Sequence, residues 1–315
     1  MTWRVGLILL LMVASRNVVA AERIVPQVPP RDAAIRVIID TDAACEIDDL
    51  YAIALAVLSP DRFKIEGFVA AHWGDSGGPD GVETSYKAIQ TVLEKAGMAD
   101  QYPVKRGSHP LRYIKVPEPS EGVDFIIERA MASTPEDPLW VVCLGACTDI
   151  ASAYLTKPEI KDRVRVYWHG RTLWPRVCSN PNVTNDLKAV RILFASELPF
   201  VLFDTGTRLT CSMEESEAKI APYGELGKYL HEFRYKHKGY QLPTKGFFDL
   251  GDVAALADPT LVKEEVVEAP TVNTDLRYDH EKTHGKMMRH YEIDRDRTFE
   301  MLFEKLKARY GKVGS

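Results

Sequence analysis

Apolar runs of strand length alternate with segments of helical periodicity through most of the chain. The runs are nearly continuous in aliphatic and aromatic residues, which is typical of strands buried on both faces. We expect strands at 36–42, 64–71, 139–145, 163–170 and 199–204. Helical patterns follow at 82–96 and 149–155 and begin at Asp48 and Asp186. This alternation predicts an α/β fold: an open, mostly parallel sheet flanked by helices, with a Rossmann-like core.

The two ends of the chain differ from this pattern. Residues 1–21 combine Arg4, an apolar run and small residues before Glu22, which is the layout of a secretory signal peptide. The run is too short for a permanent membrane span, although an uncleaved anchor stays an alternative. We therefore expect an exported, periplasmic or extracellular protein with a lead-in segment at 22–35 and a single domain over 36–315. Within that domain, the polar stretch 276–292 reads as a solvated loop, and an amphipathic helix closes the chain at 296–310.

Composition narrows the class of partner. The 315 residues carry a net charge of −5 and no basic block, so a nucleic-acid partner is not expected. A small molecule or a cation fits better. The five cysteines are odd in number and scattered, which does not form a disulfide framework, although export would allow one or two disulfides.

The most distinctive stretch is VIIDTDAACEIDDLYAIAL at 37–55, which places five acids where a strand ends and a helix begins: Asp40, Asp42, Glu46, Asp48 and Asp49. Helix capping explains one or two of them. Five like charges repel one another unless a cation intervenes, and Ca²⁺ or Mg²⁺ takes several carboxylate ligands. The stretch alone leaves capping and metal binding both open.

A second acid-headed helix begins downstream at Asp249, in GFFDLGDVAALADP. Alone, Asp249 reads as a helix cap. Ligands of open α/β sheets lie beyond the carboxyl ends of the strands, where the acidic stretch, Leu144 and the 170–185 loop are also expected. Two acid-headed helices in such a fold therefore favour one shared site.

Four blocks of the sequence, in order, resemble the inosine/uridine-preferring nucleoside hydrolase family. They are DTDAACEIDDL, LGACTDI, NPNVTNDLKAV and FFDLGDVAALADP, and the resemblance spans roughly 36–310. It implies hydrolysis of the N-glycosidic bond of a ribonucleoside or related N-riboside, with release of base and ribose. It also implies an open α/β fold and suggests a homo-oligomer.

The resemblance also implies roles for individual residues. Asp42, Asp49, Asp249 and the backbone carbonyl of Leu144 would bind one Ca²⁺ ion, and Asp42 would also deprotonate the attacking water. Asp48 and Asn182 would bind ribose hydroxyls, and Asp40 would support the loop. A carboxylate-rich site suits the oxocarbenium-like sugar of such a reaction.

The chain departs from the family pattern at several positions. The first motif is two residues longer, and its extra acid, Glu46, either binds metal or hydroxyl or faces solvent. Phe248 replaces the histidine that helps the leaving base in some members, and Asn180 replaces a glutamate, which weakens a contact to the 5′-hydroxyl. Trp73 and Phe248 are candidates for stacking on a base, together with His72, Trp168 and Trp174. Asn182 is also the first residue of a glycosylation sequon, Asn182-Val183-Thr184. We favour a role in the pocket over glycosylation for this residue.

Two other functions stay open on the sequence. A haloacid-dehalogenase-type phosphatase would use Asp40 and Asp42, but it leaves Asp48, Asp49 and Asn182 without a role. The other is an exported relative of the fold that binds Ca²⁺ or sugar without catalysis.

Overall fold

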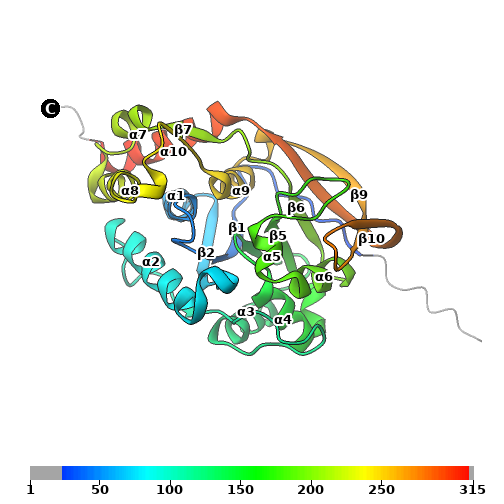
Figure 1. The fold of residues 1–315 in the computed structure, drawn as a ribbon. Coiled ribbons are helices and arrows are strands. Elements are labelled where there is room, and N and C mark those ends of the chain that lie inside the picture. The colour runs from blue at the N-terminus through cyan, green and yellow to red at the C-terminus, as the bar shows by residue number, and fades with distance from the viewer. Residues whose placement is uncertain (1–22, 312–315) are drawn as a thin grey trace, which may run out of the picture.

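One eight-stranded sheet forms the centre of the molecule in the computed structural model, which describes residues 23–311 (Figure 1). The strand order is β3-β2-β1-β4-β5-β6-β10-β9, and every neighbouring pair is parallel except β10 with β9. The strands are β1 (Ile35–Thr41), β2 (Phe63–Ala70), β3 (Val104–Arg106), β4 (Leu139–Cys143), β5 (Val164–His169), β6 (Phe200–Phe203), β9 (Val262–Val272) and β10 (Tyr278–Ile293). The predicted open, mostly parallel α/β fold is confirmed.

Helices cover both faces of this sheet, because the strand residues alternate between two apolar cores. In β1, Val37 and Ile39 belong to one core and Ile38 to the other. Helices of the first core are α1 (Asp48–Val57), α2 (Gly81–Lys95), α8 (Gly224–Lys236), α9 (Phe248–Ala257) and α10 (Arg295–Tyr310). Helices of the second are α3 (Glu121–Met131), α4 (Thr148–Thr156), α5 (Pro181–Asn185) and α6 (Leu187–Ala195).

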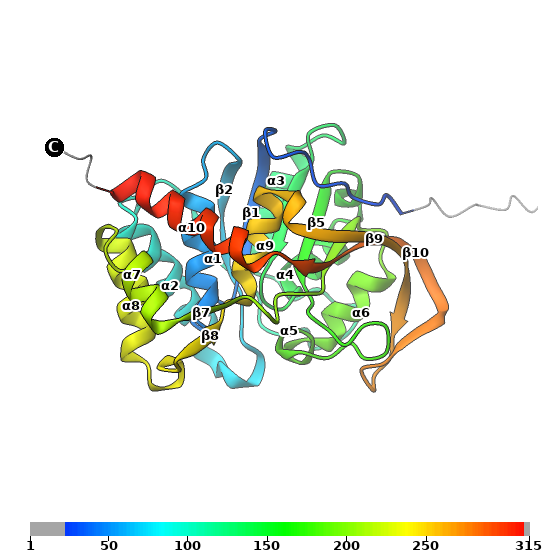
Figure 2. The same cartoon turned by 90° about the horizontal axis from the view of Figure 1, so that it is seen from above.

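Smaller elements complete the two ends of the molecule. Figures 1 and 2 show α7 (Met213–Lys219) and α8 at one end and the β9–β10 hairpin at the other. A two-stranded antiparallel sheet pairs β7 (Thr210–Ser212) with β8 (Thr244–Gly246). Short 3₁₀ helices are η1 (Gly74–Ser76), η2 (Gly78–Asp80), η3 (Pro158–Asp162), η4 (Lys238–Tyr240) and η5 (Pro259–Leu261).

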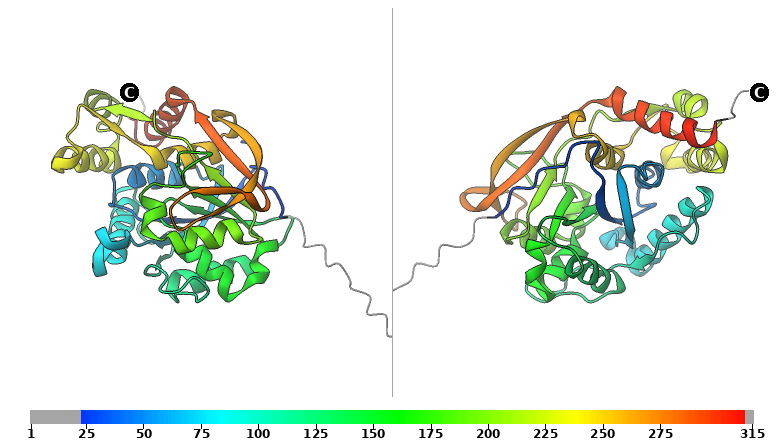
Figure 3. Two further views of the ribbon diagram at one scale, coloured as in Figure 1. Left: turned by 45° about the vertical axis from the view of Figure 1, so that its right-hand side comes forward. Right: turned by 180° about the vertical axis from the view of Figure 1, so that it is seen from behind.

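The hairpin corrects one prediction. The stretch 276–292 is not a solvated loop, because 278–293 forms β10, which pairs with β6 on one side and with β9 on the other (Figure 3). Met287, Met288 and His290 are buried there, while the polar residues of the distal half stay largely exposed. An edge hairpin with one solvated face can be polar along much of its length.

The remaining sequence expectations concern the chain ends and the cysteines. The lead-in segment is fastened by Arg62, which is buried and donates to the carbonyl oxygens of Pro29, Pro30 and Leu256 at 2.7–2.8 Å. The expected signal peptide lies outside the described residues. None of the helices within 23–311 combines the length and the hydrophobicity that a membrane span requires. All five cysteines are free.

Candidate active site

A cavity of about 280 Å³ opens at the carboxyl ends of the central strands. This is close to the lower end of the range of about 300–1,000 Å³ usual for small-molecule sites. Its lining includes Asp42, Asp48, Asp49, His169, Asn182 and Asp249. Five of these six residues were predicted site residues, and the structure brings them together from the loop after β1 and from α1, α5 and α9.

Three buried carboxylates meet where the N-termini of α1 and α9 pack against each other. One oxygen from each of Asp48, Asp49 and Asp249 lies within 4.8 Å of the other two. Asp48 Oδ2 accepts the backbone N–H groups of Phe248 (2.7 Å) and Asp249 (3.1 Å), which fixes the first turn of α9 beside α1. Asp49 accepts a hydrogen bond from the hydroxyl of Thr41, the last residue of β1. The two helix starts thus hold one carboxylate cluster.

The electrostatics of this cluster suit a hard divalent cation. Burial, followed by the charges of Asp42 and Asp48, raises the pKa of Asp49 well above its usual value. Burial also raises the pKa of Asp249, with Asp48 as the next cause. Asp48 Oδ1 is buried without a hydrogen-bond partner among the described residues. Carboxylate oxygens gathered this closely are the ligands that Ca²⁺ or Mg²⁺ takes. The unpartnered Asp48 Oδ1 can accept a hydrogen bond from a further ligand.

Asp42 lies beside the cluster, and Leu144 is linked to the cavity through Asn182. Asp42 lines the same cavity, and burial raises its pKa to about 7, with repulsion from Asp48 as a further cause. The Leu144 carbonyl oxygen accepts from Asn182 Nδ2 at 2.6 Å, and the same nitrogen donates to the His169 carbonyl at 3.0 Å. Asp40 is fully buried, and its carboxylate has no hydrogen-bond partner within 23–311.

Two functional candidates were missed at the sequence level: His169 and Asp252. His169 Nδ1 lies 2.6 Å from Asp252 Oδ2 and 3.4 Å from Asp249 Oδ1. Asp252 is fully buried one helical turn after Asp249, and these three residues form a second group that could hold a cation. Two signals favour them as candidates: His169 lies near the end of the predicted strand 163–170, and Asp252 follows Asp249 at a spacing of three residues.

Three more residues with predicted substrate contacts line the cavity wall: Asn180, Glu46 and Phe248. Asn180 caps α5 by accepting from Val183 N, and its Nδ2 donates to the Arg171 carbonyl at 2.8 Å. Glu46 pairs with Lys245 Nζ at 2.7 Å. The Phe248 ring lies under the guanidinium of Arg171, with 4.0 Å between Arg171 Cζ and the ring centroid.

The candidate stacking residues outside this wall have protein partners of their own. The indole N–H of Trp73 donates to Ser85 at 2.7 Å, and His72 Nε2 lies 2.8 Å from the Thr148 hydroxyl. Trp168 is buried against Phe194. Trp174 packs against Tyr278 and His280. Base stacking by any of these residues stays a prediction.

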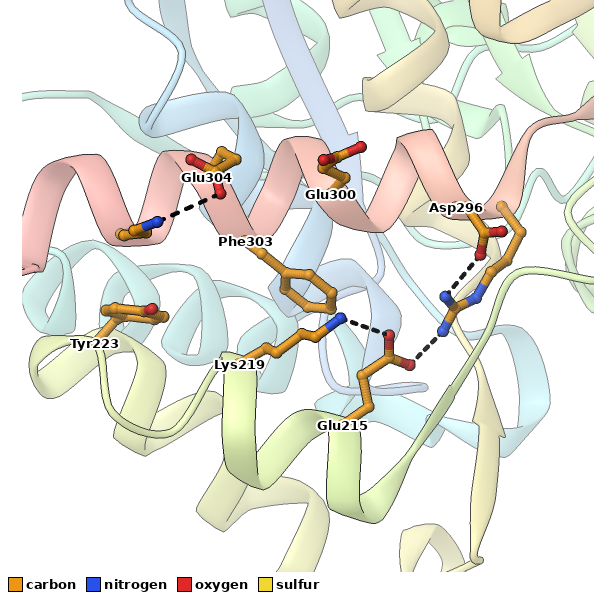
Figure 4. A pocket seen from close by; sticks show the side chains of 9 residues that line it. Glu215, Lys219, Tyr223, Asp296, Glu300, Phe303 and Glu304 are labelled. Atoms are coloured by element: carbon orange, nitrogen blue, oxygen red, sulfur yellow. Dashed lines mark hydrogen bonds and ion pairs between the residues drawn. The ribbon is translucent and has the colours of Figure 1, made fainter.

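A second hollow, between α7 and α10, has a different character (Figure 4). Most of its charged side chains are paired with one another: Glu215 with Lys219 and Arg295, and Glu304 with Lys307. The cavity at the strand ends is therefore the better candidate for chemistry, because its buried carboxylates have no lysine or arginine partner among the described residues.

Comparisons with known proteins agree with this location. Residues 37–308 match the family described as inosine-uridine preferring nucleoside hydrolase. A sequence search finds no significant match among curated proteins. A purine-preferring ribonucleoside hydrolase from Gardnerella vaginalis is similar in structure, with a TM-score of 0.70 and 22% identity over 88% of this chain and 99% of that one.

Two further solved structures share the fold. A plant nucleoside hydrolase (PpNRh1) has a TM-score of 0.68 and 21% identity over 88% of this chain and all of that one. A Bacillus anthracis protein whose structure is described as an inosine-uridine preferring nucleoside hydrolase has a TM-score of 0.69 and 16% identity, covering 87% and 99% of the two chains. The family match decides against the phosphatase and non-catalytic alternatives. The chain belongs to the inosine-uridine preferring nucleoside hydrolase family and is a hydrolase that acts on N-glycosidic bonds.

Proposed function

We propose that the protein hydrolyses ribonucleosides, or closely related N-ribosides, to base and ribose in a Ca²⁺-dependent reaction. The observation that carries this proposal is the cluster of Asp48, Asp49 and Asp249, three buried carboxylates at the strand ends of a chain of this family. Their like charges call for a cation, and their oxygens match the ligands that Ca²⁺ prefers.

Asp49, Asp249, Asp42 and the Leu144 carbonyl would hold the ion. Bound there, Ca²⁺ would supply a fixed positive charge that positions water and lowers its pKa. We assign to Asp42 the removal of a proton from the attacking water. A general base must lie beside the water from which it takes a proton, and Asp42 lines the same cavity as the carboxylate cluster.

The sugar end of the substrate would be held by Asp48 and Asn182. Asp48 Oδ1 has no protein donor within the described residues and can accept a ribose hydroxyl. Asn182 Nδ2 donates to two backbone carbonyls, which fixes the side chain. Its Oδ1 can then accept a hydrogen bond from a ribose hydroxyl. The surrounding carboxylates favour positive charge on the ribose as the glycosidic bond lengthens.

The test is ribose release from a panel of purine and pyrimidine nucleosides. Activity should disappear after EDTA treatment, return with added Ca²⁺, and fall by orders of magnitude in Asp42→Asn. Asp100→Asn, which changes an exposed acid outside the cavity, is the matched control and should retain activity. Full nucleoside hydrolysis in EDTA would refute the metal dependence, and full activity of Asp42→Asn would refute the assigned base.

We also propose export, on the strength of the signal-peptide pattern in residues 1–21. The mature chain would begin near Glu22, just before the first described residue. Intact-mass measurement of the secreted protein tests this. A species that keeps residues 1–21 would contradict cleavage.

A further inference from the structure

Arg171 stands apart from the other charged residues of the cavity. Among the described residues that line the cavity, it is the one arginine or lysine, and it shares the wall with five acids. Its guanidinium makes neither an ion pair nor a hydrogen bond within 23–311; its contact there is with the face of the Phe248 ring, 4.0 Å away. A half-buried guanidinium with unused N–H donors is available to a ligand.

The protein holds this side chain in place although it leaves the donors free. The Arg171 carbonyl accepts from Asn180 Nδ2 at 2.8 Å. The next residue, Thr172, donates its backbone N–H to Asp204 Oδ1 at 2.6 Å. Phe248 is fixed in turn, because its backbone N–H is bonded to Asp48. Stacking on an aromatic ring and a fastened backbone reduce the entropy lost when the guanidinium binds.

We propose that Arg171 contacts the substrate, donates hydrogen bonds to the leaving base, and so favours 6-oxopurine nucleosides such as inosine and guanosine over adenosine. This inference rests on the proposed nucleoside hydrolysis. An arginine can donate two parallel hydrogen bonds to two adjacent acceptors, and O6 and N7 of a 6-oxopurine are placed in that arrangement. Adenosine presents an amino donor in place of O6, and uridine has no second acceptor beside O4.

The same contact would assist the chemistry. When the bond between C1′ and N9 breaks, its electron pair passes to the base and the charge spreads to O6 and N7. The water oxygen forms the new bond to C1′, its proton passes to Asp42, and the base takes a proton from solvent. Arg171 stays charged throughout, since its pKa is too high for proton transfer, and stabilises the departing base by hydrogen bonding. This gives the leaving group a cationic partner at the wall that carries Phe248.

The experiment measures kcat and KM of the Ca²⁺-loaded enzyme on inosine, adenosine, 7-deazainosine and p-nitrophenyl β-ribofuranoside. The last has a leaving group that departs without assistance. Wild type should prefer inosine over adenosine by about 5- to 150-fold in kcat/KM. Arg171→Ala should lower kcat on inosine about 100-fold, as the loss of a transition-state donor does. It should leave p-nitrophenyl ribofuranoside hydrolysis unchanged.

Three further comparisons separate substrate contact from a structural role. Arg171→Lys should keep part of the inosine rate but lose the preference over adenosine, because an ammonium cannot grip two acceptors. 7-Deazainosine lacks the N7 acceptor, so wild type should hydrolyse it slowly. Arg171→Ala should lower that rate only a little further. Arg176→Ala, which removes an exposed charge from the same loop outside the cavity, should match wild type on all four substrates.

The inference would be overturned if Arg171→Ala lowered kcat equally on inosine and on p-nitrophenyl ribofuranoside, or on neither. The proposed function would still stand. Failure of the wild type on every substrate would overturn the proposed function and, with it, this role of Arg171.

Discussion

Replacing Asp49 with asparagine should stabilise the Ca²⁺-free protein and remove its stabilisation by Ca²⁺. Asp49 shares the cluster with Asp48 and Asp249, whose oxygens lie within 4.8 Å. Two full charges at that separation repel by about 3 kcal/mol at an effective dielectric constant of about 20. Protonation relieves part of this repulsion, because burial raises the pKa of both Asp49 and Asp249.

The expected gain is reduced by what asparagine loses. A charge in the first turn of α1 contributes about 0.3–1 kcal/mol, whereas the bond from the Thr41 hydroxyl can be kept by the amide oxygen. We therefore expect a net gain of about 1–2 kcal/mol in EDTA, which raises Tm by about 2–6 °C in a chain of this size. Because the folded-state pKa of Asp49 is raised, wild type loses stability as the pH rises above 3.8, and the gain should grow with pH.

The assay is thermal unfolding of wild type, Asp49→Asn and Asp100→Asn, each in EDTA and in excess Ca²⁺. Ca²⁺ at 100 times its dissociation constant should stabilise wild type by about 2.7 kcal/mol. Asp100→Asn should respond like wild type, and Asp49→Asn should respond little. A lower Tm for Asp49→Asn in EDTA, or an unchanged response to Ca²⁺, would refute the reasoning.

Two other substitutions probe the walls of the cavity. Asp252→Asn should weaken Ca²⁺ affinity or activity about 10–100-fold, because Asp252 fixes the His169 ring beside the carboxylate cluster. Calorimetric titration with Ca²⁺ and steady-state kinetics measure the two quantities. Wild-type values for both would contradict this role of Asp252. Glu46→Gln should lower the free energy of unfolding in urea by about 1–3 kcal/mol, because the Lys245 side chain, only 9% exposed, loses its anionic partner. Lys245→Met should cost less than about 1 kcal/mol, because Glu46 is 48% exposed and can be hydrated. If Lys245→Met lost as much unfolding free energy as Glu46→Gln, or more, the argument from the burial of Lys245 would be wrong.

The central strands and the carboxylate cluster could be predicted for the same physical reason. Strands buried on both faces must be apolar throughout, which made β1, β4, β5 and β6 recognisable from the sequence. Acids directly after such strands or at helix starts stand out against that background. In a parallel sheet these positions converge at one edge, so distant acids such as Asp49 and Asp249 could be assigned to one site.

The β9–β10 hairpin and the His169–Asp252 pair escaped prediction because tertiary contacts define them. β10 lies between β6 and β9, and its polar residues do not show a strand pattern until those partners are known. The histidine pair joins positions 83 residues apart, and the spacing along the chain does not indicate which acid the ring will meet. The spacing of three residues places Asp252 near Asp249 on the helix, but it does not show that the Asp252 side chain meets the histidine.

The departures from the family pattern meet on one wall of the cavity. The longer first motif turns through Ala44, whose φ of 71° lies in the left-handed region. It carries Glu46 to Lys245, and the Lys245 ammonium lies 5.4 Å from the centroid of the Phe248 ring. Arg171 covers the same ring. The positions at which the sequence is expected to depart from the family pattern thus lie on one wall, away from the carboxylates that would face the cation and the sugar. Such a division predicts that this protein differs from its relatives in how it handles the base and resembles them in how it handles ribose.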